Sequence, residues 1–220
     1  MIATALALSF LSLSQPGPSF DCRRATTDSE RAICADPLLS TLDRDMAAQY
    51  GRTRARLSGP GRDALRRDQQ AFLRLREIVY DGRDDPVMAD FPRLGERIAQ
   101  RTSFLSGINA RPQGELIGVW GNLFGTVEIR RGTDGRFVVA IDTVNPQTAG
   151  WICHVEYEGA VVDGRLDGPP IRDREVTVGV RLRDGYIEVT ETWVVEAHDS
   201  ADYCGHNGFV AGDYLPIQPR

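Results

Sequence analysis

The segment VTVGVRLRDGYIEVTETW, residues 176–193, decides the fold of the C-terminal half of this chain. Every second residue from Val176 to Leu182 is apolar, which is the period of a half-buried β-strand. Asp184-Gly185 then supplies a tight turn, and the apolar alternation resumes at Ile187. The segment therefore predicts an antiparallel β-hairpin.

The same pattern extends upstream to Glu115. Asp134-Gly135 separates two further alternating stretches, and Cys153, Val155 and Tyr157 share one face of another predicted strand, with the Cys153 thiol pointing inward. We count about eight strands, mostly in sequential hairpins, which predicts an antiparallel β-barrel or sandwich over residues 115–220.

Residues 20–108 follow a helical period instead. Thr27 and Glu30 have the spacing of a capping box, and Asp36-Pro37 has the N-cap and first residue of a second helix. One-sided apolar stripes follow on either side of a break at Ser58–Gly61 and a polar loop at Asp81–Pro86, so these helices should pack as a small bundle. With residues 109–114 as a linker, the chain is predicted to be an α+β protein of two domains.

An uncharged apolar segment occupies residues 2–14. At about 13 residues it is too short to span a bilayer and fits the core of a signal peptide. We therefore expect a signal peptide at residues 1–19, although no basic residue precedes the apolar run, and a periplasmic or secreted mature protein without a membrane span. A buried N-terminal helix is the alternative.

The four cysteines lack the CxxC spacing of redox and metal sites. Behind an apolar leader they predict two structural disulfides, and the simplest pairing is Cys22–Cys34 and Cys153–Cys204. In the chain-entropy model these loops are worth about 3 and about 4 kcal/mol respectively. Free buried thiols in a cytosolic protein are the alternative.

The charge is divided unevenly along the chain. The net charge is −5, from 26 Arg, no Lys and 31 acidic residues. Residues 20–110 carry 16 Arg against 14 acidic residues, whereas residues 111–220 carry 10 Arg against 17. This distribution argues against general nucleic-acid binding and assigns the acidity to the β half.

No catalytic motif occurs, so we predict a non-enzymatic protein without catalytic residues, metal or cofactor. HExxH, GxSxG, GxGxxG and the phosphate-binding GxxxxGK[ST] are all missing from the sequence. His198 and His206 flank Asp199, Asp202 and Cys204, but a disulfide at Cys204 would remove the thiolate from any such metal site. Gly118-Val119-Trp120 weakly resembles the first-strand pattern of calycin barrels, and Trp120 as an ordinary core residue is the alternative.

Residues 20–106 resemble the lysozyme inhibitor LprI N-terminal domain family. The likeness rests on Phe20-Asp21-Cys22, Ile33-Cys34-Ala35-Asp36 and the segment Gln69–Glu77, in which Phe72 stands at the family's Trp position. The family's two further cysteines are both missing here, which supports the local pair Cys22–Cys34. The motif residues suggest fold roles, with Asp43 and Arg76 pairing between helices; they are Asp21, Glu30, Asp36, Asp43, Gln69, Phe72 and Arg76.

The resemblance implies an exported protein that binds and occludes lysozyme without turnover. Since lysozymes are generally basic, the acidic β half would meet the partner first. The candidate contact loop spans residues 197–207 and carries Asp199, Asp202, Tyr203 and His206. Two alternatives stay open: a non-inhibitory envelope module whose β half binds a small apolar ligand or cell-wall fragment, and a hydrolase with two converging carboxylates.

Overall fold

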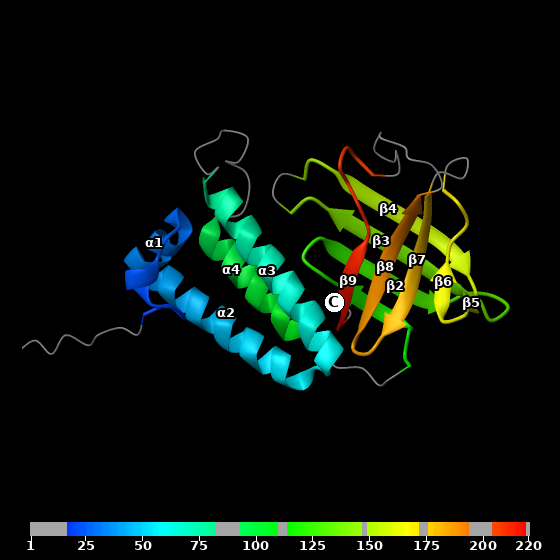
Figure 1. Ribbon diagram of the computed structural model, residues 1–220, viewed down its shortest axis with the longest axis horizontal. Coiled ribbons are helices and arrows are strands. Elements are labelled where there is room, and N and C mark those ends of the chain that lie inside the picture. Colours follow the sequence, from blue (N-terminus) through cyan, green and yellow to red (C-terminus); the bar gives the residue numbers. More distant parts are fainter. Residues whose placement is uncertain are drawn as a thin grey trace, which may run out of the picture.

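The helices gather on one side of the molecule and the strands form a barrel on the other (Figure 1). This computed structural model describes residues 17–81, 93–109, 114–146, 149–171, 176–193 and 204–218. Within these ranges the chain has a short 3₁₀-helix, four α-helices and then nine strands. The predicted α+β organisation, helical first and β second, is confirmed.

The helices begin where the capping residues predict. The elements are η1 (Cys22–Arg24), α1 (Asp28–Ala35), α2 (Pro37–Arg56), α3 (Gly59–Asp81) and α4 (Leu94–Gly107). Thr27 and Glu30 form the expected capping box, and the Asp36 carboxylate accepts hydrogen bonds from the backbone N–H groups of Leu38 and Leu39. The predicted break at Ser58–Gly61 is shorter than expected, because Pro60 is tolerated in the first turn of α3.

All nine strands pair antiparallel in one sheet, in the order β4-β3-β2-β1-β9-β8-β7-β6-β5. They are β1 (Gly118–Gly121), β2 (Gly125–Arg131), β3 (Phe137–Val144), β4 (Ile152–Gly159), β5 (Val161–Val162), β6 (Arg165–Asp167), β7 (Val176–Arg183), β8 (Tyr186–Trp193) and β9 (Gly212–Ile217). Both predicted hairpins, β2–β3 and β7–β8, are present. β9 pairs with both β1 and β8 and so joins the two halves of the sheet, which curls into a nearly closed barrel.

Among the described strands, the barrel is open between β4 and β5, which lie at the two ends of the strand order. A single residue, Ala160, connects these two strands. Across the opening, the Tyr157 hydroxyl donates a 2.9 Å hydrogen bond to the Leu166 carbonyl. The unpaired edge of β4 is therefore partly held by β6.

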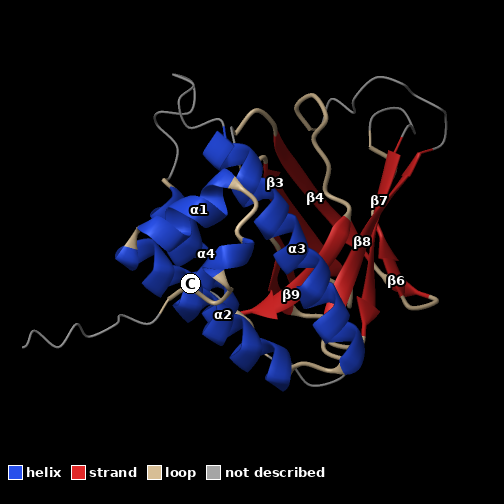
Figure 2. Cartoon of the chain, turned by 60° about the vertical axis from the view of Figure 1, so that its left-hand side comes forward, coloured by secondary structure: helices blue, strands red, loops and turns tan. Residues whose placement is uncertain are grey.

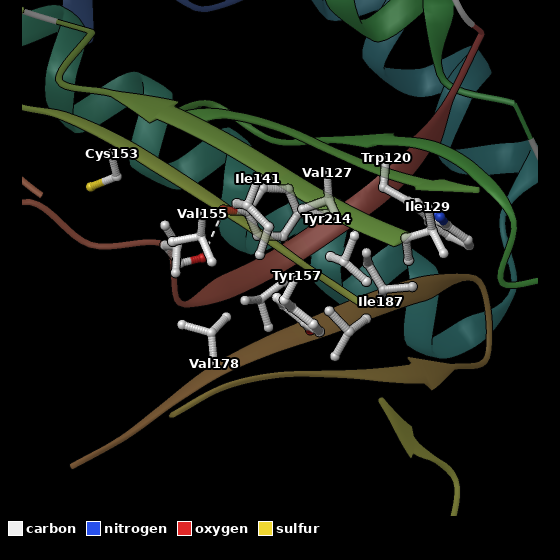
Figure 3. Packing of buried hydrophobic residues seen from close by; sticks show 14 of the residues in the cluster. Trp120, Val127, Ile129, Ile141, Cys153, Val155, Tyr157, Val178, Ile187 and Tyr214 are labelled. Carbon is white, nitrogen blue, oxygen red and sulfur yellow. Dashed lines mark hydrogen bonds between the residues drawn. The ribbon is translucent and has the colours of Figure 1, made fainter. Parts of the chain in front are cut away.

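The barrel interior is filled by side chains (Figure 3). Trp120 is 1% exposed and donates its indole N–H to the Leu116 carbonyl at 3.0 Å. The inward face of β4 is buried as predicted, whereas Trp193 is 40% exposed and stands outside the core. The buried cluster also contains Val127, Ile129, Val139, Ile141, Trp151, Val155, Tyr157, Leu166, Val178, Val180, Ile187, Val189, Val210 and Tyr214.

The helices pack against the outside of the barrel, with α3 alongside β9 (Figure 2). Leu215 of β9 belongs to the same buried cluster as Leu65 and Leu105 of the helices. Gly121 permits this close approach, since a Cβ there would lie 3.2 Å from Cε2 of Phe104 on α4. At the predicted linker, the Asn109 N–H donates to the Pro216 carbonyl at 2.9 Å, while residues 110–113 lie outside the described residues.

Both predicted disulfides are formed, Cys22–Cys34 and Cys153–Cys204. Two structural disulfides are typical of proteins from oxidising compartments. Among the described residues, no helix combines the length and apolarity that a membrane span needs. Most of the predicted signal peptide, residues 1–16, lies outside the described residues.

Candidate functional site

A buried polar network contains two of the motif residues, Asp43 and Arg76. Arg76 and Asp43 form the predicted ion pair, with 3.6 Å between guanidinium and carboxylate and side chains that are 6% and 3% exposed. Arg76 also pairs with Glu77 at 2.9 Å, and the Ser29 hydroxyl donates to Glu77 at 2.6 Å. Ser19 donates its N–H and hydroxyl to Asp43 at 2.9 and 2.6 Å. The network therefore joins the start of the chain to α1, α2 and α3.

A second buried network lies between α3, α4 and the barrel. Arg101 donates to the Asp68 carboxylate at 2.7 Å and to the Gln69 amide oxygen at 2.8 Å. Its guanidinium carbon also lies 5.4 Å from the Phe72 ring centroid and 4.9 Å from that of Phe104. This arrangement gives Gln69 and Phe72 packing roles within the fold.

Sequence reasoning missed Asp68 and Arg101. Arg101 lies three residues after Ile98 and four before Leu105, so it interrupts the buried stripe of α4. A charged residue on an apolar helical face is the signal that could have indicated a buried ion pair. The partner could not be found from that signal, since Asp68 is 33 residues away in sequence.

The remaining motif residues cap helices. Asp21 accepts a hydrogen bond from the Arg23 N–H, and its side-chain bond to Arg23 lowers the pKa of this carboxyl. Hydrogen bonds, chiefly from the Thr26 N–H, lower the pKa of Glu30 as well. Together with the Asp36 cap, these contacts give each of the three residues a local fold role.

The predicted contact loop is described only at its end. His206 is exposed, whereas Asp199, Asp202 and Tyr203 lie outside the described residues. Cys204 is held to β4 by its disulfide, and the Gly205 N–H donates to the Ile152 carbonyl at 3.2 Å. The described end of the loop is therefore anchored beside the first residue of β4.

The outer surface of β2, β3 and β4 concentrates exposed carboxylates. Alternate residues of these strands point outward; they are exposed throughout β4 and from Thr126 to Arg130 of β2, whereas in β3 only Asp142 and Val144 are exposed. We call this surface the acidic face; its charged and titratable residues are Glu128, Arg130, Asp142, His154, Glu156 and Glu158. Four carboxylates thus stand against one arginine and one histidine.

The strand register aligns these side chains in rows. Glu128 and Glu156 are both opposite Ala140, from β2 and β4 respectively, so they lie two strand spacings or about 10 Å apart. Val144 and Ile152 are paired at one end of the face and are 36% and 65% exposed. The face therefore combines an acidic area with a small exposed apolar pair, beside the anchored end of the loop.

Among the described residues, no group of three or more His, Cys, Asp or Glu side chains could hold a metal ion. With four carboxylates against one arginine and one histidine, the acidic face carries a net negative charge. No family model, curated protein or solved structure matches this chain.

His154 makes the charge of the acidic face dependent on pH. Its Nδ1 lies 2.7 Å from the Asp142 carboxylate. This hydrogen bond is the main reason that the pKa of His154 is raised above its ordinary value, with a further contribution from the Glu156 charge. The acidic face therefore gains a positive charge as the pH falls through the raised pKa of His154.

Replacing Asp142 with asparagine should lower the pKa of His154 toward 6.5, because the imidazolium loses its charged acceptor. The stability contributed by the pair should be present below the unfolded pKa and be lost as the pH rises through the raised folded value. Since both side chains are more than 60% exposed, the contribution should stay below about 1 kcal/mol. A histidine NMR titration of the two proteins measures the shift; identical titration curves would contradict it.

Proposed function

We propose that this protein is exported to the periplasm or secreted, and that it binds and occludes a basic lysozyme-type hydrolase without turnover. The observation that carries the proposal is the acidic face, where Glu128, Asp142, Glu156 and Glu158 are exposed together. Complementary potentials accelerate encounter and select the partner by charge. The apolar leader and the two disulfides support the proposed compartment.

The area of the acidic face alone is too small for a stable complex, so neighbouring segments must also contact the partner. Three strands of this length cover roughly 25 by 15 Å, which is about half of the ~800 Å² that each partner buries in a typical complex. The anchored loop at Cys204 adjoins the Ile152 end of the face and could supply additional contacts. In the proposed mechanism this loop enters the saccharide cleft while the acidic face meets Arg and Lys side chains around it.

The helical half has a supporting role in this proposal. Its motif residues form ion pairs and helix caps, and the Asp68 carboxylate accepts the Leu123 N–H at 2.8 Å from the turn between β1 and β2. The helices thereby brace the barrel from outside. A ligand within the barrel has less support, because the interior is occupied by Trp120, Tyr157 and Tyr214 among others.

Reversing charge on the acidic face should weaken inhibition of a basic lysozyme. The variant Glu128→Arg/Glu156→Arg changes two carboxylates of one row, and we expect its inhibition constant to rise at least about tenfold. The control variant Asp45→Arg/Asp63→Arg reverses two exposed charges on the helices, and it should change the inhibition constant less than about threefold. Bacterial lysis by a basic lysozyme, recorded at low and high salt, measures the effect.

Inhibition should also weaken at high salt, since screening shortens the reach of exposed charges. No inhibition by the unaltered protein at a large molar excess would reject the proposed function. Inhibition that both double variants lose equally would instead reject the acidic face as the contact surface.

A further inference from the structure

Six exposed arginines gather where α2 ends and α3 begins, at the lower edge of the molecule in Figure 1. The only acidic residue between positions 51 and 67 is Asp63, so this part of the chain carries a strong excess of positive charge. At a rise of 1.5 Å per residue, the three arginines of each helix span less than about 10 Å. We call this surface the basic corner; its arginines are Arg52, Arg54, Arg56, Arg62, Arg66 and Arg67.

Nearby carboxylates neutralise only part of this charge. Arg66 pairs with Asp63 at 3.5 Å, and Arg67 pairs with Asp213 of β9 at 2.7 Å. The exposed Asp184 of the β7–β8 turn also adjoins the corner, and the ion pair that flanks this turn is neutral in itself. Subtracting these three carboxylates from the six arginines leaves an excess of three positive charges.

The stability of the helices does not explain this excess. The arginines of α2 lie at its C-terminal end, where cations are favourable, but Arg62 lies in the first turn of α3, where the helix dipole disfavours them. Its guanidinium donates only to the neutral Leu57 carbonyl, at 2.9 Å. Four arginines of the corner have no carboxylate partner among the described residues; they are Arg52, Arg54, Arg56 and Arg62.

The composition of the basic corner favours phosphate groups on a flat surface. A guanidinium matches a phosphate with two parallel hydrogen bonds. Residues 51–67 contain no aromatic side chain on which a nucleic-acid base could stack. The two large apolar residues of this segment, Leu57 and Leu65, are buried, so the corner offers charge without an apolar wedge.

We infer that the basic corner binds the surface of an anionic phospholipid bilayer, with its arginines on the lipid phosphates and no insertion into the hydrocarbon core. Each arginine near such a surface raises the affinity about fivefold, so the four unpaired arginines give a reversible, salt-sensitive attachment. The inference does not rest on lysozyme binding, since it uses a different surface. The corner adjoins the β7–β8 turn, whereas β1 and β9 separate β8 from the strands of the acidic face.

Vesicle sedimentation with two lipid compositions tests the inference. The purified full chain should bind vesicles of equal parts phosphatidylglycerol and phosphatidylcholine at least about tenfold more tightly than vesicles of phosphatidylcholine alone, and high salt should remove this preference. Residues 2–14 carry no charge and are common to every variant, so they produce neither the preference nor a difference between variants. A single-stranded DNA oligonucleotide at the same phosphate concentration should bind more weakly than the anionic vesicles.

Two double variants with the same net charge locate the contact. Arg54→Gln/Arg62→Gln removes two unpaired charges of the corner and should weaken binding to the anionic vesicles at least about tenfold. Arg23→Gln/Arg24→Gln removes two exposed charges of η1, which a disulfide holds near the start of α2, roughly 30 Å of helix away from the corner. This control should weaken binding less than about threefold.

A gain of binding provides a test that a folding defect cannot imitate. Asp63→Asn removes the one carboxylate of residues 51–67 and should tighten binding to the anionic vesicles about threefold. The inference would be overturned by a lack of salt-sensitive preference for anionic vesicles, by equal losses in the two double variants, or by weaker binding of Asp63→Asn. Binding of the oligonucleotide as tight as that of the vesicles would overturn it as well, in favour of a nucleic-acid surface.

Discussion

Replacing Arg101 with methionine is expected to lower the free energy of unfolding by about 3–5 kcal/mol, because it breaks a buried ion pair by removing one partner. The Asp68 carboxylate would remain in a site where its side chain is 6% exposed, without the guanidinium 2.7 Å away. The Gln69 amide oxygen would lose its donor as well. Denaturant unfolding of the two proteins at neutral pH measures the difference.

Two control variants separate the buried charge from other effects. Arg66→Met removes an exposed arginine that pairs with Asp63 at 3.5 Å, and it should cost less than about 1 kcal/mol. The double variant Arg101→Met/Asp68→Asn should recover a large part of the loss, since asparagine keeps an uncharged oxygen for the Leu123 N–H. An equal cost for Arg66→Met, or no recovery in the double variant, would contradict the assignment of the loss to Asp68.

The network of Asp68 and Arg101 also shows which contacts cannot be predicted from sequence patterns. Caps, hairpins and the pair Asp43–Arg76 follow from local patterns or from the family resemblance, and all three are confirmed. The contacts of Asp68 with Arg101 and with the Leu123 N–H join residues 33 and 55 positions apart. No local period encodes such contacts, since they arise only once α3 and α4 pack against the β1–β2 turn.

Prediction of the acidic face from sequence is limited in the same way. Alternation in each strand predicts that Glu128 and Glu156 point away from the core. Their alignment opposite Ala140 depends on the register between β3 and β4, and the connection between these strands is too long for a two-residue turn to set that register. The individual polar positions were thus predictable, whereas their gathering into one charged surface was not.

Removing the Cys153–Cys204 disulfide, by changing both residues to alanine, is expected to lower the free energy of unfolding by about 4 kcal/mol. The bond spans 51 positions of sequence and joins β4 to the segment that leads into β9. The unfolded chain would regain the entropy of this long loop, and truncating the fully buried Cys153 would leave a small void as well. Denaturant unfolding with intact disulfides as the reference measures the loss.

The Cys22–Cys34 bond provides the matched control. It spans 12 positions and Cys22 is exposed, so the Cys22→Ala/Cys34→Ala variant should lose about 3 kcal/mol without a buried void. The two variants should also differ in function if the loop near Cys204 contacts the partner, because only the first releases that loop from the Ile152 end of the acidic face. At temperatures where both variants stay folded, lysozyme inhibition should then fall for Cys153→Ala/Cys204→Ala. A greater loss of both stability and inhibition in Cys22→Ala/Cys34→Ala would contradict both expectations.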